Sequence, residues 1–329
     1  MVCDWGLDHP VMSTRHNRQV IAVCKRSQIR MQAVAELLLL SSDLMPVTTE
    51  RLAVFGGCLA KCQDSILTRS KGLMVFANKV KEQLFSRLPD WNSISHFIME
   101  ICELVIGLIE CSTHAAYLMV MTKPQCVPAV PGAVDRYRVC RATVEIEICC
   151  KELQTTPLED MIPHFLVRAC SDMNRYLTGF TDSCKAAADQ IQNQNDRDQF
   201  KLCIKSFTSS ASCLMAAVKS FNVKPSETHH RRCINFCEPV ISSTRSAAKF
   251  ATEPQFIGRG ARLTPEGKET KKAVFGSCQG IVSACVQLCK SVMELAYDSR
   301  NQCHLHRVQL CLESITRSSS QLTEALFPS

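Results

Sequence analysis

Apolar residues recur at three- and four-residue spacings along nearly the whole chain, and this period constrains the fold more than any other feature of the sequence. Glycine and proline, which interrupt helices, number only 12 and 13 among 329 residues. No Asn-Gly or Asp-Gly turn joins two alternating runs, so strand signals are nearly absent. The pattern therefore predicts an all-α fold built from helical bundles.

Nine helices are expected, and two irregular segments rich in proline and glycine divide them into groups of three, four and two. The first break covers residues 123–132 and the second covers residues 252–262. Thr49 offers an alternative, earlier start for the second helix. The expected helices are, group by group, 19–40, 57–87 and 93–121, then 134–154, 157–191, 196–221 and 225–251, then 264–297 and 301–327.

The three, four, two arrangement predicts one bundle inserted into another. Four helices can close a core by themselves, but two remaining helices expose a broad apolar face and are marginal alone. We therefore expect a discontinuous five-helix bundle from residues 19–123 plus 260–329, an inserted four-helix bundle from residues 131–256, and a disordered tail over residues 1–18. The alternative is three units in a row.

The chain lacks the features of a membrane-spanning or secreted protein. Its longest apolar stretch, residues 97–121, is interrupted by Glu100, Glu103 and Glu110, so it falls short of the roughly 18 uncharged residues that a bilayer crossing requires. The first 17 residues have acidic and proline residues where a secretory signal has a continuous apolar core. A cytoplasmic location is expected.

The 21 cysteines are not spaced as a disulfide framework. Their number is odd, the chain is too long to need covalent staples, and many lie on helical apolar patterns. Several pairs are four residues apart and so share a helix face: Cys58 and Cys62, Cys233 and Cys237, and Cys285 and Cys289. We expect reduced core thiols that pack as small hydrophobic side chains.

The formal net charge is +7, from 38 basic and 31 acidic residues spread without a long single-sign run. This balance favours weak attraction to an acidic partner. The charge distribution does not indicate nucleic-acid binding, which requires clustered basic residues and usually aromatic residues among them.

No motif indicates an enzyme, a cofactor or a metal site. The segment 276–280, Gly-Ser-Cys-Gln-Gly, resembles a nucleophile elbow but falls inside an expected helix instead of on a strand-to-helix turn. His230, Cys233 and Cys237 share a helix face and are residue types that zinc prefers, but a fourth ligand is not evident. The three glutamates of residues 97–121 are better explained by a solvated or interhelical polar seam than by paired catalytic acids.

The helix expected at 225–251 carries an apolar arc of about 200°, roughly twice the width typical of a surface helix. Phe236 and Phe250 lie on one shoulder of its core face, and Ile234 and Ile241 on the other. Pro239 removes a helical amide, so a kink is expected near Phe236. We interpret the arc as a protein interface, most simply a two-fold dimer contact. The alternative is that helices of the same bundle cover both shoulders.

The chain resembles the talin rod, and within it the small free-standing talin rod domain-containing proteins, from about Lys25 to the last helix. The residues that carry this resemblance form an ordered set of blocks. They are VAELLLLSSD from Val34, RSKGL from Arg69, ECSTHAAYL from Glu110, VDRYRV from Val134, TPLEDM from Thr156, QFKLCIKSFTSSAS from Gln199, FATEPQF from Phe250 and EGK from Glu266. Residues 1–18 and 43–55 depart from the family pattern.

The resemblance implies a four-helix module nested in a five-helix one. It also implies binding to filamentous actin and homodimerisation through the four-helix module, with Phe236 in the dimer-face helix, so that a dimer bundles filaments in filopodia and during cell migration. Because the actin surface is acidic, the candidate contacts are lysines of the five-helix module, and added salt is expected to weaken binding. They are Lys71, Lys79, Lys81, Lys268, Lys271 and Lys272.

Two other functions remain open. One is an adhesion adaptor that docks short amphipathic LD-type helical motifs of adhesion or signalling proteins without bundling actin. The other is a force-sensitive element, in which polar and small residues over 208–212 weaken core packing.

Overall fold

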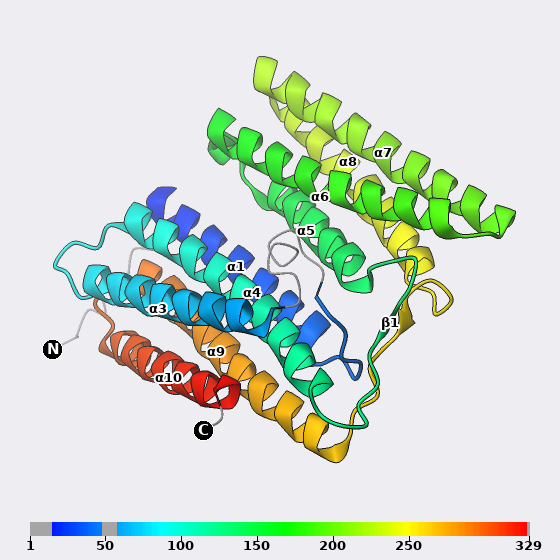
Figure 1. Cartoon of the computed structure of the whole chain (residues 1–329). Coiled ribbons are helices and arrows are strands. Elements are labelled where there is room, and N and C mark those ends of the chain that lie inside the picture. The colour runs from blue at the N-terminus through cyan, green and yellow to red at the C-terminus, as the bar shows by residue number, and fades with distance from the viewer. Residues whose placement is uncertain (1–14, 48–57, 328–329) are drawn as a thin grey trace, which may run out of the picture.

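The computed structural model describes residues 15–47 and 58–327, and within them it is built almost entirely of helices (Figure 1). The all-α prediction is confirmed. The α-helices are α1 (Arg15–Leu39), α3 (Leu59–Leu84), α4 (Trp91–Met121), α5 (Arg136–Thr155), α6 (Pro163–Gln190), α7 (Gln194–Val223), α8 (Glu227–Ala251), α9 (Pro265–Tyr297) and α10 (Gln302–Leu326). Two strands, β1 (Val130–Pro131) and β2 (Gly258–Arg259), and a 3₁₀-helix (Leu158–Asp160) complete the described elements.

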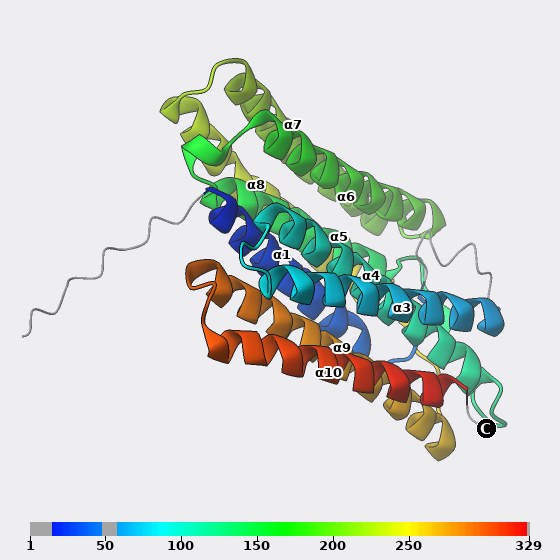
Figure 2. The ribbon, with the colours of Figure 1, turned by 90° about the vertical axis from the view of Figure 1, so that its left-hand side faces the viewer.

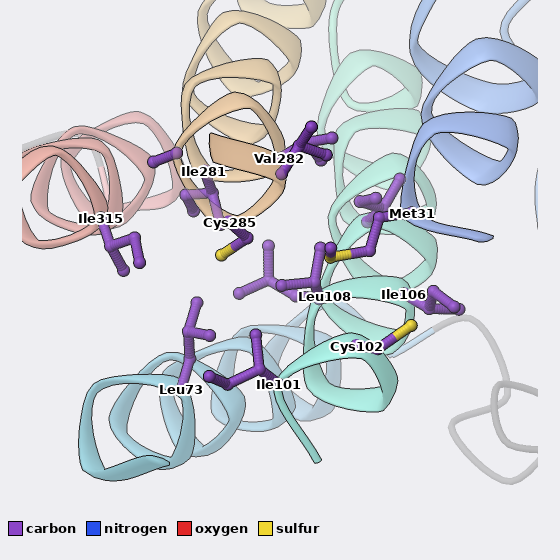
Figure 3. Packing of buried hydrophobic residues seen from close by; sticks show 14 of the residues in the cluster. Met31, Leu73, Ile101, Cys102, Ile106, Leu108, Ile281, Val282, Cys285 and Ile315 are labelled. Carbon is purple, nitrogen blue, oxygen red and sulfur yellow. The ribbon is translucent and has the colours of Figure 1, made fainter. Parts of the chain in front are cut away.

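Five helices, α1, α3, α4, α9 and α10, surround one hydrophobic core of aliphatic and thiol side chains. Leu73 of α3, Ile101 and Leu108 of α4, Cys285 of α9 and Ile315 of α10 all point into it (Figure 3). Each of the five residues is fully or almost fully buried. This bundle therefore brings together helices from the two ends of the sequence.

Helix α4 lies at the centre of the molecule. Every residue from 105 to 116 is buried, because α1, α3 and α9 pack around the helix and α5 covers its remaining face. Burial on all sides explains why this stretch is the most apolar of the chain. Among the described residues, no helix is both long enough and apolar enough to cross a membrane.

Helices α5 to α8 surround a second core that is rich in phenylalanine. The ring centroids of Phe180 and Phe207 lie 4.9 Å apart, and those of Phe200 and Phe256 lie 5.2 Å apart. Phe221 is also fully buried in this core. Figures 1 and 2 show this four-helix bundle on the side of α1 and α4, with α10 farthest from it.

The two irregular breaks meet in space. Val130 and Pro131 pair with Arg259 and Gly258 in an antiparallel ribbon, which a Val127–Arg262 bridge extends. The crossing is tight, since a Cβ on Gly258, which has a φ of 75°, would lie 2.2 Å from the Val130 carbonyl oxygen. The chain thus leaves the five-helix bundle and returns to it through one narrow ribbon. Sequence analysis predicted the two irregular breaks but not their pairing.

Some expected boundaries are wrong. The helix expected at 157–191 is a 3₁₀-turn followed by α6, which begins at Pro163. Proline is favoured in the first helical turn, and Ile162 before it is extended, so the helix begins there. Helix α1 begins at Arg15, so residues 15–18 of the expected tail are helical. Residues 1–14 and the alternative start at Thr49 lie outside the described residues.

Candidate partner-binding surfaces

Helix α8, the expected dimer helix, is an outer helix of the four-helix bundle. The Ser226 hydroxyl caps it by accepting a hydrogen bond from the His229 amide at 3.3 Å, and the helix continues through Pro239. Its inward face carries small side chains, Cys233, Cys237 and Ala247, which belong to the same core as the phenylalanines of α6 and α7.

The bundle itself covers most of the apolar arc of α8, which corrects the expected extent of exposed surface. Ile241 is only 3% exposed. The Phe250 ring is half-buried, with its centroid 4.8 Å from that of Phe200. Ile234 is also half-buried, whereas Phe236 is 37% exposed. Phe236 is therefore the member of this set that presents a large apolar side chain to solvent.

The lysines of α3 project from the surface of the five-helix bundle. The Lys79 ammonium lies 5.1 Å and 5.6 Å from the ring centroids of Phe76 and Phe97. The Lys81 ammonium lies 5.9 Å from the centroid of Phe85, and Lys71 is exposed. Aromatic contacts of this kind hold a lysine side chain in place without neutralising its charge.

The lysines of α9 differ in exposure and in hydrogen bonding. Lys268 and Lys272 are exposed. Lys271 instead donates hydrogen bonds to the carbonyl oxygens of Ser41 and Ser42, just beyond the end of α1, at 3.0 and 3.1 Å. Burial lowers the pKa of Lys271 below its usual value. Lys271 is therefore held against the end of α1, unlike the two exposed lysines of α9.

The structure separates these lysines into two groups, which we call the α3 lysines and the α9 lysines. Lys79 lies against Phe97 near the start of α4, whereas a Cβ on Gly267 would lie 3.1 Å from Val120 at the end of α4. These two levels of α4 are 23 residues apart, which at 1.5 Å per residue is roughly 35 Å. The candidate lysines therefore do not form one cluster.

The residues considered as a nucleophile elbow and as a zinc site can be located in the structure. Cys278 lies within α9, fully buried, and burial raises its pKa to about 12, so its thiol is a poor nucleophile. His230 Nε2 lies 3.1 Å from the Thr156 carbonyl oxygen, and the Cys237 thiol donates to the Cys233 carbonyl oxygen at 3.2 Å. Over the described ranges, no group of three His, Cys, Asp or Glu side chains is arranged to hold a metal ion.

The small residues of α7 do not loosen its core as expected. Within 208–212 only Ala211 is buried, while Thr208 and Ser212 donate to carbonyl oxygens four residues earlier in the helix. The core of α7 is formed by Phe200, Phe207 and Leu214. The weakened packing proposed for a force-sensitive element is therefore absent from this segment.

Sequence analysis missed a group of charged residues between the two bundles. Arg30 of α1 and Glu145 of α5 are 7% and 2% exposed, and they form an ion pair. The signal that pointed to this region was the glutamate series of α4, since Glu103 and Glu110 also lie there and accept hydrogen bonds from Arg30 and Arg141.

The described residues thus define the class of an all-α protein made of two packed helical bundles. Comparison with known proteins places the chain further. Residues 134–254 match the family model of the Talin IBS2B domain. Talin-1 of Gallus gallus is 24% identical over 242 residues, and Talin-2 of Homo sapiens is 20% identical over 240 residues. Each alignment covers 73% of this chain but only 9% of the talin.

Talin of Oscarella pearsei is 20% identical over 241 residues, again 73% of this chain and 9% of that protein. The chain therefore contains a talin rod domain and is a relative of the talin rod, as its sequence blocks indicated.

Proposed function

We propose that the chain is a cytoskeletal adaptor that binds filamentous actin through its five-helix bundle and bundles filaments as a homodimer formed through α8. The observation that carries the dimer is the exposed Phe236 on α8, within the segment that matches the talin domain. On this proposal the protein acts in the cytoplasm with the actin cytoskeleton, as in filopodia and migrating cells.

Charge supports the assignment of actin binding to the five-helix bundle. Residues 15–123 and 260–327 carry 21 Lys and Arg against 15 Asp and Glu, whereas residues 131–256 carry 16 against 14. The excess of positive charge thus lies in the five-helix part of the molecule. An acidic filament surface would attract this part first, through exposed lysines such as Lys79 and Lys268.

Phe236 has an exposed charged neighbour on its own side of α8, Arg232, which lies one turn before it. A two-fold axis near Phe236 would bring the same residue of two copies of α8 together. The two phenylalanines then pack at the centre, where an interface gains most from an aromatic side chain.

Sedimentation of actin filaments separates binding from bundling. Intact protein is expected to pellet filaments at low speed, because a dimer holds two filaments. Phe236→Asp is expected to lose dimer mass and low-speed pelleting while still binding filaments at high speed. Val167→Asp is the matched control, since Val167 is more exposed than Phe236 but lies on a different helix, α6. A Phe236→Asp protein that keeps dimer mass and bundling contradicts the proposed dimer.

The lysine groups are tested by charge reversal. Lys79→Glu and the pair Lys268→Glu and Lys272→Glu are expected to weaken binding to actin, and added salt is expected to weaken binding by the intact protein. Lys205→Glu is the control, since Lys205 is exposed on α7 of the four-helix bundle. Binding that is indifferent to salt and to both reversals contradicts the electrostatic proposal.

A second candidate, docking of short amphipathic LD-type helices, is favoured by an open groove between α9 and α10. Its lining combines apolar and polar side chains: Ser283, Ala284, Gln287, Arg307, Leu310, Cys311 and Ser314. Leu310 is the most exposed apolar residue of this lining. Fluorescence anisotropy with a labelled LD-type peptide tests this function, and Leu310→Glu is expected to abolish a signal that comes from the groove.

A further inference from the structure

The two bundles meet through charged side chains. Helix α1 of the five-helix bundle lies beside α5 of the four-helix bundle in both views of the molecule (Figures 1 and 2). We call the charged residues between them the charge seam. Its members are Arg26 and Arg30 of α1, Glu103 and Glu110 of α4, Arg141, Glu145 and Glu152 of α5, and Asp172 of α6.

The centre of the charge seam is the pair of Arg30 and Glu145. Arg30 Nε lies 2.9 Å from both carboxylate oxygens of Glu145. The other nitrogens of the guanidinium reach Glu103 at 2.5 Å and the Tyr176 hydroxyl at 3.4 Å. Arg30 of α1 thus joins α4 of its own bundle to α5 and α6 of the four-helix bundle.

The ion pairs on the two sides of this centre differ in which bundle provides the hydrogen-bond donor. On one side Arg26 donates to Asp172 at 2.7 Å and to Glu152 at 3.3 Å. On the other side the four-helix bundle provides the donors, because Arg141 and the Tyr137 hydroxyl both donate to Glu110 of α4. Each bundle therefore contributes both positive and negative side chains to the seam.

One whole face of α5 is committed to this contact. Tyr137, Arg141, Glu145, Ile148 and Glu152 follow each other at three- and four-residue intervals, which places them on one side of the helix. Ile148 is 4% exposed but belongs to neither hydrophobic core, and Tyr137 packs against the core of the five-helix bundle. Helix α5 is thus shared between the two bundles.

A seam of this kind specifies orientation. A buried ion pair loses its hydration, and it regains that free energy only when the partner is in place with good geometry. An apolar contact tolerates sliding, whereas each carboxylate here is satisfied at one position of the opposing guanidinium. Because the central pair is buried, it is also screened less by salt than a surface pair.

We propose that the charge seam holds the four-helix bundle at one fixed orientation on the five-helix bundle, and that breaking its centre converts the β1–β2 ribbon into a hinge while both bundles stay folded. Besides the seam, the bundles are joined by the covalent ribbon, the packing of Tyr137 on the five-helix core and the more exposed Arg18–Asp160 ion pair. Each bundle keeps its own core. In a bundling dimer, which rests on the function proposed above, this clamp would fix the angle between the two actin-binding bundles.

The distance between the bundles tests the clamp directly. Spin-labelled non-natural amino acids at Lys290 of α9 and Asp182 of α6, both exposed, report that distance by pulsed electron resonance. Diluting labelled with unlabelled protein leaves one labelled copy in any dimer, so the result is independent of dimerisation. Intact protein is expected to give a single narrow distance peak at low and at high salt.

Glu145→Gln is expected to lose that single peak and to shift distances upward, with an unchanged helical circular dichroism spectrum. Glu147→Gln is the matched control, because Glu147 lies two residues away on α5 but pairs with Arg245 inside the four-helix bundle. Should Glu145→Gln fail to fold, Asp172→Asn at the more exposed edge of the seam makes the same test. The proposal is overturned if folded Glu145→Gln gives the distance peak of the intact protein. If Asp172→Asn is used in its place, the same result overturns the proposal.

Discussion

The two bundles fill their cores in different ways. The core of the four-helix bundle combines large rings of α6 and α7, such as Phe180, Phe200 and Phe207, with small side chains of α8, such as Cys233 and Ala247. Large and small side chains interdigitate when they come from facing helices. The five-helix core instead consists mainly of aliphatic and thiol side chains, with Phe275 as a buried ring.

The bundles also differ in where exposed aromatic residues lie. Phe236 lies within α8, whereas Phe85, Tyr297 and Phe327 of the five-helix part lie at or just beyond the ends of α3, α9 and α10. On α8, Val240 and Ile241 are buried in the core and Phe250 packs against Phe200, whereas Phe236 lies off the buried face. In the five-helix bundle α4 is buried on all sides and leaves no comparable residue at its centre. The partner surfaces proposed for that bundle are accordingly charged.

Core truncation should give the largest effects and should be local to one bundle. Phe200→Ala removes a ring that contacts Phe250 and Phe256, so it is expected to lower the free energy of unfolding by about 3–5 kcal/mol. Leu73→Ala in the other core is expected to cost about 2–5 kcal/mol. Denaturant unfolding measures both, and amide hydrogen exchange shows which bundle is affected.

The control for this pair is Leu202→Ala, which removes an exposed apolar side chain two residues from Phe200 and should change stability by less than about 0.5 kcal/mol. Equal loss of exchange protection in both bundles after Phe200→Ala would show that the two cores are not independent.

Hydroxyl caps allow a matched comparison at smaller magnitude. Ser226 caps α8 of the four-helix bundle and Thr264 caps α9 of the five-helix bundle, each by accepting an amide hydrogen bond. Ser226→Ala and Thr264→Ala are each expected to cost about 1 kcal/mol, measured by thermal unfolding. Ser226→Asp retains an acceptor and should keep most of the stability, so an equal loss in that variant contradicts the capping role.

A pH-dependent effect of one buried histidine should act on the five-helix bundle. His114 of α4 is buried with neither ring nitrogen hydrogen-bonded, and burial lowers its pKa below 6.5. As the pH falls, the histidine is therefore protonated in the unfolded chain before it is protonated in the folded protein. Protonation of His114 has little effect on the free energy of unfolding above pH 6.5 and lowers it as the pH falls below that value.

Urea unfolding midpoints across this range measure the effect. His114→Leu is expected to flatten the acid side of the profile, whereas His164→Leu, which replaces an exposed histidine on α6, should leave it unchanged. An identical slope in all three proteins would exclude His114 as its source.

Thiol accessibility should differ least between the bundles. Cys58 and Cys303 of the five-helix part and Cys213 of the four-helix part are exposed, so a water-soluble thiol reagent should modify them first. Cys102 is buried, and burial raises its pKa to about 12, so it should react only on unfolding. Modification of the three exposed thiols should change stability by less than about 0.5 kcal/mol, and mass spectrometry identifies the modified sites.

Much of the architecture was predictable from local pattern. The apolar period and the sparse glycine and proline residues predicted the helices and their two breaks, because a helix depends on neighbours three and four residues away. Cys62 and Cys233 occupy the core positions that their spacing indicated, while Cys58 is exposed. The start of α6 was missed because a second proline, Pro163, lies only six residues after the first, at Pro157.

The candidate sites were less predictable. Helical spacing placed Ile241 and Phe250 on the shoulders of α8, but it contains no information on how far a neighbouring helix reaches over them. The same spacing grouped lysines by sequence, whereas the antiparallel course of the helices set Lys79 and Lys268 at different ends of the bundle.

The sequence by itself determined which segments are helical and which faces are apolar, since those properties depend on residues within one or two turns. Only the tertiary structure decided which charges meet. Arg30 and Glu145 are 115 positions apart in the chain, and no local rule pairs them. They meet because two separately formed cores bring α1 and α5 side by side, where a buried charge requires a partner of opposite sign.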